Sequence, residues 1–421
     1  MKVIIIGAGI IGITTAWYLA QRGAQVVVFD ARPGPAEGCS FANGGQFSYA
    51  YSEPLASPAM RLKLSSLLFR RDHTLRLGSG AFPSLIPWGW KFLRNCTGRA
   101  FQSNLSKVLK LALYSRGVLH DLLDHHELSF DYRRTGKLHV YGDAADLVEA
   151  EKVVRLKAAL DCHQKILDRQ TCLAHEPMLA HFGGELVGGI FSPLDESGDT
   201  RILTHRLMER LVLDGTCTFR FKEPVVRIER VGDRVKHIAT SETRYEADTY
   251  IVCAGALSGR LLRPLGLRLA IQAVKGYSIT VPATPQTPDV NITDMSRKMV
   301  YTRLGDRLRI AGTMHINGYD ERVSDMSIHH LLNTASERFP LAGDYQNPSS
   351  AWAGLRPMTP DGAPFIGETA YHNLLLNTGH GMLGSTLSFG SARLLTDLLY
   401  GTKPTIPTEG FRTDRFYHPP S

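Results

Sequence analysis

Three glycines and one aspartate near the start of the chain have the types and spacing of a phosphate-binding turn. Gly7, Gly9 and Gly12 follow an apolar run, and Asp30 closes the next apolar run. The first two glycines would let the backbone turn tightly and approach a pyrophosphate, and the third would let a helix pack close to a strand. Amides at the helix N-terminus attract phosphates, while the Asp30 carboxylate would accept hydrogen bonds from a ribose. In this context the pattern predicts a dinucleotide site.

A second glycine-rich loop lies near the other end of the chain, at Asn377–Thr386. Its glycines and exchangeable N–H groups come just before an apolar helical stretch, so it would form a preorganised cluster of donors. A nicotinamide cofactor needs no second clamp of this kind. A reduced flavin carries negative charge at its N1–C2 carbonyl edge, which a helix N-terminus would stabilise. The two loops together favour a flavin dinucleotide.

An arginine precedes this second loop in a constrained setting. Arg356 stands in the run Gly354-Leu-Arg356-Pro, and further glycines and prolines follow it up to Gly367. Such a sequence predicts a rigid loop that holds a guanidinium over a site. The alternative is an arginine that pairs with a carboxylate in the core.

The elements that must position these residues alternate between strand and helix at both ends of the chain. Strands are predicted at Lys2–Ile6, Gln25–Phe29, Tyr132–Tyr141, Leu186–Phe191, Thr218–Phe221, Val225–Glu229, Ala247–Cys253, Ala273–Val281, Lys298–Ile316 (with a turn at Gly305-Asp306) and Leu374–Asn377. Helices are predicted at Ile13–Arg22, through most of residues 55–125, around Asp146–Asp161, at Arg201–Leu213, and after the second glycine loop with Gly401 as C-cap.

This order predicts an α/β plus α+β fold. A Rossmann-like FAD-binding domain would be assembled from both chain ends, in residues 1–50, 197–262 and 345–421. A substrate-binding domain built on an antiparallel sheet would be inserted, in residues 51–196 and 263–344. A chain of 421 residues is long enough for two such units.

Composition excludes several other classes. The net charge is +8, but the basic residues are spread along the chain without a nucleic-acid-binding motif. Six scattered cysteines without a CxxC pair, and histidines without a metal-binding spacing, fit a reducing compartment and no metal. The opening run Val3–Ala20 is apolar enough for a signal peptide, but its fingerprint glycines argue against that. We therefore expect a cytoplasmic protein.

One segment suggests contact with a membrane surface. Ile86–Arg94 places Trp88 and Trp90 beside Lys91 and Arg94. Aromatic rings next to basic side chains suit a layer of lipid headgroups, so the protein could lie peripherally on the inner face of the cytoplasmic membrane. A core-facing helix with solvated charges is the ordinary alternative.

Taken together, the motifs resemble the D-amino acid oxidase and glycine oxidase superfamily of flavoproteins, and within it the bacterial D-amino acid dehydrogenases of the small-subunit type. The resemblance covers nearly the whole chain. Its motifs are the fingerprint, Ser40-Phe-Ala-Asn43-Gly-Gly-Gln46, Asp195-Glu-Ser-Gly-Asp199, Lys275-Gly-Tyr277-Ser, Gly354-Leu-Arg-Pro and Asn377-Thr-Gly-His-Gly. The stretch Ser48-Tyr-Ala-Tyr51 differs from the version typical of enzymes that act on D-alanine, which leaves the preferred substrate open.

The resemblance implies that FAD is bound by residues from both chain ends. Gly7, Gly9, Ile10, Ile11 and Gly12 would hold the pyrophosphate, and Asp30, Ala31 and Arg32 the ribose. Ser40, Asn43, Gly44, Gly45 and Gln46 would face the pyrophosphate and the isoalloxazine, Val226 would meet the adenine through its backbone, and Gly255 would lie over the dinucleotide. The edge of the flavin ring would be lined by Gly379, His380, Gly381, Met382, Leu383 and Gly384. Gly354 would also contact the cofactor.

The reaction implied is FAD-dependent oxidative deamination of a D-amino acid, by hydride transfer to flavin N5, with electrons passed to an acceptor such as quinone. Arg356 would clamp the substrate carboxylate in a bidentate manner, Tyr277 would donate to the same carboxylate, and Tyr51 would line the pocket. Other functions stay open: the FAD subunit of a heteromeric proline, hydroxyproline, opine or glycine dehydrogenase, an oxygen-using oxidase, or a flavin-binding scaffold without turnover.

Overall fold

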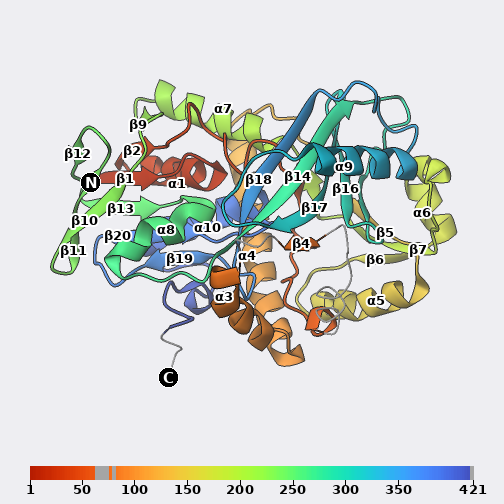
Figure 1. The fold of residues 1–421 in the computed structure, drawn as a ribbon, viewed down its shortest axis with the longest axis horizontal. Coiled ribbons are helices and arrows are strands. Elements are labelled where there is room, and N and C mark those ends of the chain that lie inside the picture. Colours follow the sequence, from red (N-terminus) through yellow and green to blue (C-terminus); the bar gives the residue numbers. More distant parts are fainter. Residues whose placement is uncertain (62–74, 78–81, 418–421) are drawn as a thin grey trace.

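Two large sheets form the body of the protein. The computed structural model describes residues 1–61, 75–77 and 82–417. In Figure 1 the strands that open the chain lie at the left, and the long strands β14, β17 and β18 lie at the centre and right. The blue C-terminal elements lie beside the red N-terminal ones. Both ends of the chain therefore contribute to the left-hand half.

The left-hand half is a six-stranded sheet in the order β19-β20-β13-β1-β2-β9. Its strands are β1 (Lys2–Ile6), β2 (Gln25–Phe29), β9 (Cys217–Arg220), β13 (Thr249–Val252), β19 (Phe365–Glu368) and β20 (Leu374–Thr378). Neighbours from β20 to β9 pair in parallel, and β19 is antiparallel to β20. The first two strands have the predicted bounds, and the crossover helix α1 (Ile10–Gln21) joins them. The predicted Rossmann-like sheet from both chain ends is confirmed.

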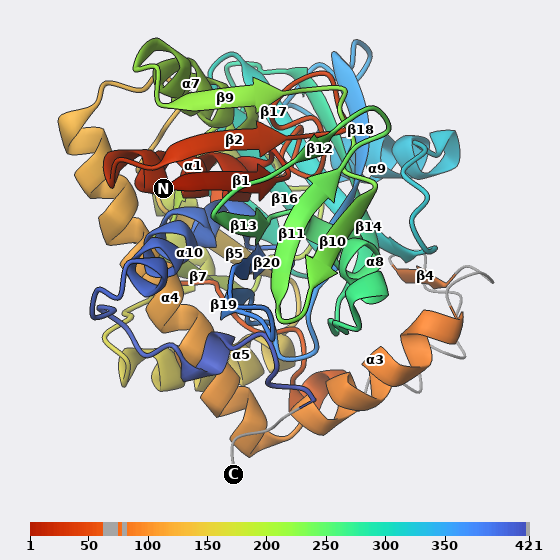
Figure 2. The same cartoon turned by 90° about the vertical axis from the view of Figure 1, so that its left-hand side faces the viewer.

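Alternating side chains of this sheet build two cores. Val3 and Ile5 pack against helices on one face, whereas Ile4 and Ile6 pack against a smaller sheet on the other. The helices are α1, α4 (Gly98–His125), α7 (Thr200–Leu213) and α10 (Gly384–Leu399). The smaller sheet, in front in Figure 2, consists of β10 (Arg227–Val231), β11 (Arg234–Ala239) and β12 (Arg244–Tyr245). Because both faces are covered, the central strands are mostly apolar.

The right-hand half is a nine-stranded sheet that is mostly antiparallel. Its path is β18 (Ser350–Met358), β14 (Gln272–Pro282), β17 (Arg307–Ile316), β16 (Met299–Leu304), β15 (Asn291–Asp294), β5 (Lys137–Tyr141), β7 (Gly188–Ser192) and β6 (Lys165–Asp168), with β4 (Leu75–Leu77) beside β17. Helix α9 (Asp325–Arg338) packs on one face, where Leu331 contacts a core that contains Ile279 and Ile310. Helices α5 (Ala144–Ala158) and α6 (Arg169–His175) lie near β5 to β7.

The structure differs from the sequence predictions in several places, of which three concern the organisation of the two halves. Only part of residues 55–125 is described as helix, namely α4 and α3 (Phe82–Asn95), while 62–74 and 78–81 lie outside the described residues. Helix α4 packs with α1 and α10 through Val108 and Leu119, although its sequence was assigned to the substrate unit. Strand β18 lies in the nine-stranded sheet, so the chain re-enters the six-stranded sheet only at β19. The domain limits stay a prediction.

Short elements complete the description. They are β3 (Gln46–Phe47) paired with β8 (Glu196–Ser197), the short helix α8 (Ser258–Leu262), and the 3-10 turns at Pro177–His181, Gly255–Leu257, Arg263–Leu265 and Glu409–Phe411. No helix in the described part of the chain is long and apolar enough to cross a bilayer.

Candidate active site

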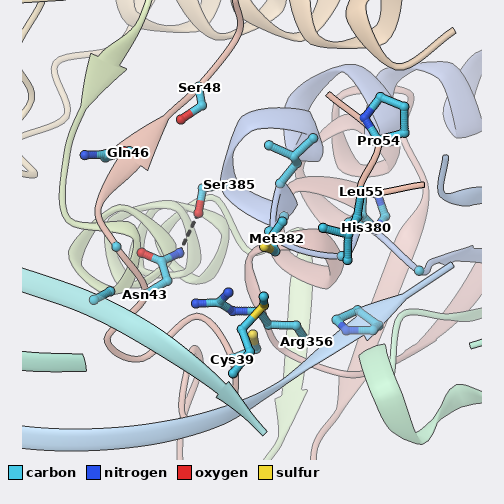
Figure 3. A pocket seen from close by; sticks show the side chains of 18 of the residues that line it. Cys39, Asn43, Gln46, Ser48, Pro54, Leu55, Arg356, His380, Met382 and Ser385 are labelled. Carbon is cyan, nitrogen blue, oxygen red and sulfur yellow. Dashed lines mark hydrogen bonds between the residues drawn. The ribbon is translucent and has the colours of Figure 1, made fainter. Parts of the chain in front are cut away.

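One long cavity of about 1030 Å³ runs between the two sheets. Residues of the β1–α1 turn line one part of it, and residues of β14, β18 and the loop before α10 line another. Figure 3 shows Cys39, Arg356 and Met382 close together in this region, with His380 and Leu55 to one side. The volume is at the upper end of the range for small-molecule sites. The cavity therefore has room for a ligand larger than one amino acid.

The β1–α1 turn is built so that backbone atoms approach one another closely. Gly7 has φ +113°, and a Cβ placed there would lie 2.5 Å from the Cys253 carbonyl oxygen. A Cβ at Gly12 would lie 1.8 Å from the Gly7 carbonyl oxygen, so helix and turn pack together only because Gly12 has no side chain. Gly7, Gly9, Ile10 and Ile11 line the cavity, and Gly12 lies behind them. The helix N-terminus is thereby presented to the cavity, where it favours an anion.

Asp30 stands at the carboxyl end of β2 and lines the cavity with Ala31 and Arg32. Its Oδ2 accepts a hydrogen bond from the Ala8 N–H at 2.7 Å, and its Oδ1 accepts one from the Arg32 N–H at 2.9 Å. A carboxylate has about four acceptor positions, so these two bonds orient the group and leave capacity for a ligand hydroxyl.

The loop after β20 presents a second helix N-terminus to the same cavity. Gly379 and Gly381 have positive φ, and Leu383, which precedes α10, provides no side-chain cap. All six residues from Gly379 to Gly384 line the cavity. The His380 Nε2 lies 3.0 Å from the Ser391 Oγ, and burial lowers the pKa of His380 to about 3. A neutral, anchored imidazole fixes this loop rather than exchanging protons near neutral pH.

The segment after Cys39 lies between the two helix N-termini. Ser40 Oγ accepts a hydrogen bond from the Ile10 N–H at 3.1 Å, and the Asn43 side-chain amide donates to Ser385 Oγ at 2.6 Å. The second bond is drawn in Figure 3. Ser40, Asn43 and Gly44 line the cavity, as does Gln46, whose Nε2 is buried without a hydrogen-bond partner among the described residues. Gln46 therefore offers an unused donor to a ligand.

Arg356 extends its guanidinium into the cavity from β18. Within the described part of the chain, the guanidinium makes no hydrogen bond or ion pair with protein atoms; its titratable neighbour is the Cys39 thiol, whose pKa is raised by burial. Burial lowers its pKa from the ordinary value. The side chain crosses β14 at Gly276, where a Cβ would lie 2.7 Å from the guanidinium Nε. The predicted alternative of a core carboxylate partner finds no support.

The two tyrosines predicted at the site both line the cavity. Tyr277 is buried in the core on the α9 side of the sheet, and its hydroxyl lies 3.3 Å from the His315 Nδ1. The ring of Tyr51 lies 4.0 Å from that of His139, and its hydroxyl is 3.8 Å from the Met295 sulfur. Their contacts with substrate stay predictions.

Some predicted cofactor residues lie outside the cavity wall. Gly45 makes a turn with φ +66°, and its N–H donates to Asn43 Oδ1. Gly354 makes room for the ring of Trp352, which would meet a Cβ at 2.0 Å. Val226 is 61% exposed and its N–H donates to the Ala239 carbonyl, because the small sheet begins there. Pro224 and Val225 line the cavity instead, so the structure does not bring Val226 to the predicted position; Gly255 does line it.

Comparisons with known proteins agree with this geometry. The model of the family described as FAD dependent oxidoreductase matches residues 2–398. The chain belongs to this family. It is 42% identical to a D-amino acid dehydrogenase of Paramagnetospirillum magneticum over 99% of both chains, and 40% identical to one of Rhizorhabdus wittichii over 99% of this chain and 100% of the relative. It shares its fold with a glycine oxidase of Geobacillus kaustophilus (TM-score 0.77, 20% identity), covering 98% of this chain and 99% of that one.

As a member of the FAD dependent oxidoreductase family, the protein uses FAD, and its residues fit that cofactor. The β1–α1 turn packs closely because Gly7 and Gly12 lack side chains, and the packing presents the N-terminus of α1 to the cavity, where a pyrophosphate would bind. The unpartnered Gln46 amide and the uncapped start of α10 face the cavity at the other end. FAD has a diphosphate and an electron-rich ring system, so each of these donor groups has a matching acceptor.

Sequence reasoning missed several basic and aromatic residues of the cavity. Lys137 and His139 on β5 and Lys157 on α5 line the part of the cavity near Tyr51, and Trp352 lines the part near Arg356. In the sequence of β5, polar and apolar residues alternate: Lys137, His139 and Tyr141 lie on one face of the strand, and Leu138 and Val140 lie on the other. That pattern is typical of a strand with a solvated face, so the sequence does not indicate that these polar residues line a cavity.

Proposed function

We propose that this enzyme catalyses the FAD-dependent oxidative deamination of D-amino acids to 2-oxo acids and ammonia, and that its electrons pass to an acceptor other than oxygen, such as quinone. The observation that supports this most directly is the Arg356 guanidinium, which extends into the FAD cavity without a protein partner in the described residues. A planar fork of donors binds a carboxylate through two parallel hydrogen bonds. Relatives similar over their full length are named D-amino acid dehydrogenase, which supports D-amino acids as the substrate class of this protein rather than the alternatives named above.

The residues of the chain would act by positioning. Arg356 would hold the substrate carboxylate, with Tyr277 as a second donor, so that the α-hydrogen faces the flavin. When bound, FAD supplies the acceptor for the hydride. Removal of a hydride from a neutral amine needs no protein base at the carbon, which agrees with the neutral state of His380. The imino acid product is then hydrolysed by water.

A substrate screen tests the proposal. The purified protein should be yellow and release FAD on denaturation. D-amino acids should bleach its absorbance under anaerobic conditions, and turnover should proceed with an artificial dye faster than with oxygen. Bleaching by L-amino acids or proline alone would contradict the proposed substrate class, and rapid turnover with oxygen would contradict the proposed acceptor.

We further propose that helix α3 brings the enzyme to the surface of the membrane that holds the acceptor. Ile86 and Trp90 are 59% and 66% exposed, and Arg94 is exposed nearby. Trp88, by contrast, faces inward: its Nε1–H donates to the Met358 carbonyl at 3.0 Å and its ring stacks on Phe92. An outward tryptophan beside a cation is suited to a headgroup layer.

Sedimentation with vesicles tests this placement. The wild type should bind vesicles that contain anionic lipid, and Trp90→Ser should bind them more weakly. Val212→Ser is a matched control, because Val212 is 52% exposed on α7, away from this helix. Equal binding of the wild type and Trp90→Ser would contradict a role for α3.

A further inference from the structure

One part of the cavity wall is a basic chamber, which we define by Tyr51, Lys137, His139 and Lys157. Strand β5 forms its floor with Lys137 and His139, helix α5 covers it with Lys157, and Tyr51 lies between. The Lys137 Nζ is 4.8 Å and the Lys157 Nζ 5.8 Å from the centre of the Tyr51 ring. Two ammonium groups therefore share one aromatic ring at the cavity wall.

Lys137 is the group whose bonding is incomplete. It is 3% exposed, and its Nζ donates to the Ser48 Oγ at 3.0 Å. No carboxylate oxygen of the described residues lies within 4.0 Å of it, although an ammonium has three donors. Burial lowers the pKa of Lys137 to about 8, so it is mostly charged at neutral pH. A buried cation without a paired anion is unfavourable, and a ligand anion would relieve that cost.

Two acidic groups, Glu53 and Asp195, act on the charge of Lys137. The Glu53 Oε1 accepts a hydrogen bond from Lys157 Nζ at 2.8 Å, and this Nζ also donates to the Ala50 carbonyl. Asp195 is fully buried outside the cavity wall; its Oδ1 accepts a bond from the Ala50 N–H at 2.6 Å, and its Oδ2 has no hydrogen-bond partner among the described residues. These carboxylates moderate the positive charge, but neither lies within ion-pair distance of the Lys137 ammonium among the described residues.

His139 is subject to the positive charge of both lysines. Its ring is buried, and burial together with the charges of Lys137 and Lys157 lowers its pKa well below the ordinary value. The imidazole is therefore neutral and does not add a third charge. A ligand cation in this chamber would face two ammonium groups, whereas a ligand anion would be attracted by both.

The chamber is also close to the cofactor loop. Ser48, which accepts the bond from Lys137, donates its own N–H to Thr386 Oγ1 at 2.9 Å. Thr386 is in the first turn of α10, directly after the residues that would edge the flavin. Arg356 and the basic chamber line the same cavity, and the bond from Ser48 to Thr386 links the chamber to the start of α10.

We propose that Lys137 binds a second acidic group in the side chain of the substrate, so that the enzyme prefers D-amino acids with an acidic side chain, such as D-glutamate or D-aspartate, to their neutral amides. The proposal rests on the proposed function. Lys157, held by Glu53, and the neutral His139 would line the pocket around that group. When a neutral amide of the same shape binds, Lys137 stays unpaired, and that loss provides the discrimination.

The selectivity of the wild type is the first test and requires no variant. We expect kcat/KM for D-glutamate to exceed that for D-glutamine, and kcat/KM for D-aspartate to exceed that for D-asparagine, each by roughly tenfold or more. If D-alanine and the amides are oxidised but the acids are not preferred, this inference fails while the proposed function stands. If no D-amino acid bleaches the flavin, the proposed function itself fails. A preference for D-lysine or D-arginine would indicate that Glu53 is the group that binds the side chain.

The second test removes the charge. Lys137→Met should lower kcat/KM for the acidic substrate by roughly 30-fold or more and that for D-alanine by less than threefold. Lys165→Met, at an exposed position of β6 in the same sheet, is the control and should change neither value. Titration of the flavin absorbance with glutarate, compared with butyrate, gives a readout without turnover: the preference for glutarate should be lost in Lys137→Met. Equal losses for all substrates, with unchanged glutarate affinity, would contradict the proposal.

Discussion

At the scale of single residues, the site depends on cations that protein carboxylates do not neutralise. Arg356 in the cavity has no ion pair among the described residues, and Lys137 has only a hydroxyl acceptor. A guanidinium kept free of partners is costly to bury. The cost is acceptable where a ligand carboxylate restores the missing bonds, which makes Arg356 the residue most sensitive to substitution.

Arg356→Lys should lower kcat/KM for every amino acid substrate by roughly 30-fold or more, because a lysine cannot form two parallel hydrogen bonds with the carboxylate. FAD content, measured from the absorbance ratio, should be unchanged, since Arg356 is not expected to hold the cofactor. Unaltered kinetics would remove Arg356 from the site, and loss of FAD would show a structural role instead.

Lys137 predicts a pH dependence that is specific to acidic substrates. Its pKa is lowered to about 8, so the charged form prevails below that pH and is lost above it. The charged neighbours are Asp195, Glu53 and Lys157, and of these the two carboxylates favour the charged form. We expect KM for D-glutamate to rise as the pH increases from 7 to 9, relative to KM for D-alanine over the same range. Parallel profiles for the two substrates would contradict this assignment.

The sequence could reveal Arg356 but not Lys137, for a physical reason. Glycine and proline around Arg356 constrain the backbone locally, so they mark the residue in the sequence itself. Lys137 lies on a strand whose polar face would be solvated if α5 did not cover it. Whether a polar face meets water or a cavity is decided by packing between distant segments. Residues marked by their local sequence, such as Arg356, are therefore predictable, whereas residues whose surroundings depend on packing, such as Lys137, are not.

At the scale of elements, glycines decide how closely strands and side chains approach. Gly276 on β14 lies opposite Gly354 on β18, and each gives space to a large side chain of β18, Arg356 in the first case and Trp352 in the second. In the sequence these glycines look like weak points of a strand. In the structure they are the positions where the guanidinium and the indole reach the cavity.

Gly276→Ala should therefore impair catalysis without removing the cofactor. The new Cβ would lie 2.7 Å from the guanidinium Nε, and the guanidinium must shift. A displacement approaching 1 Å can lower kcat/KM by about 100-fold, and we expect a fall of between about 10-fold and 100-fold with normal FAD content. Gly259→Ala on α8 is the control, because a Cβ there meets nothing within 4 Å. Similar kinetics for both variants would show that Arg356 is not positioned by this contact.

At the scale of the whole molecule, the cofactor cavity joins segments that are far apart in sequence. The β1–α1 turn and the loop before α10 line the same cavity, and the segment Ser40–Asn43 connects them, because Ser40 Oγ accepts a bond from the Ile10 N–H and the Asn43 amide donates to Ser385 Oγ in the first turn of α10. The pairing of both chain ends was predictable, because each end contains a strand, a glycine loop and a helix. The place of β18 in the second sheet was not, since a strand near the C-terminal end gives no local sign of which sheet it joins.

Because both ends of the chain contribute to the FAD site, removal of FAD should destabilise the protein as a whole. A ligand that binds only the folded state stabilises it by about 2.7 kcal/mol at a free concentration one hundred times its Kd. The protein stripped of FAD should therefore unfold a few degrees lower in temperature than the loaded form, and its Tm should rise with added FAD. The measurement is differential scanning fluorimetry with an FAD titration, with riboflavin as a control because it lacks the diphosphate that the β1–α1 turn would bind. A Tm that riboflavin raises as far as FAD does would contradict a contribution of that turn to binding.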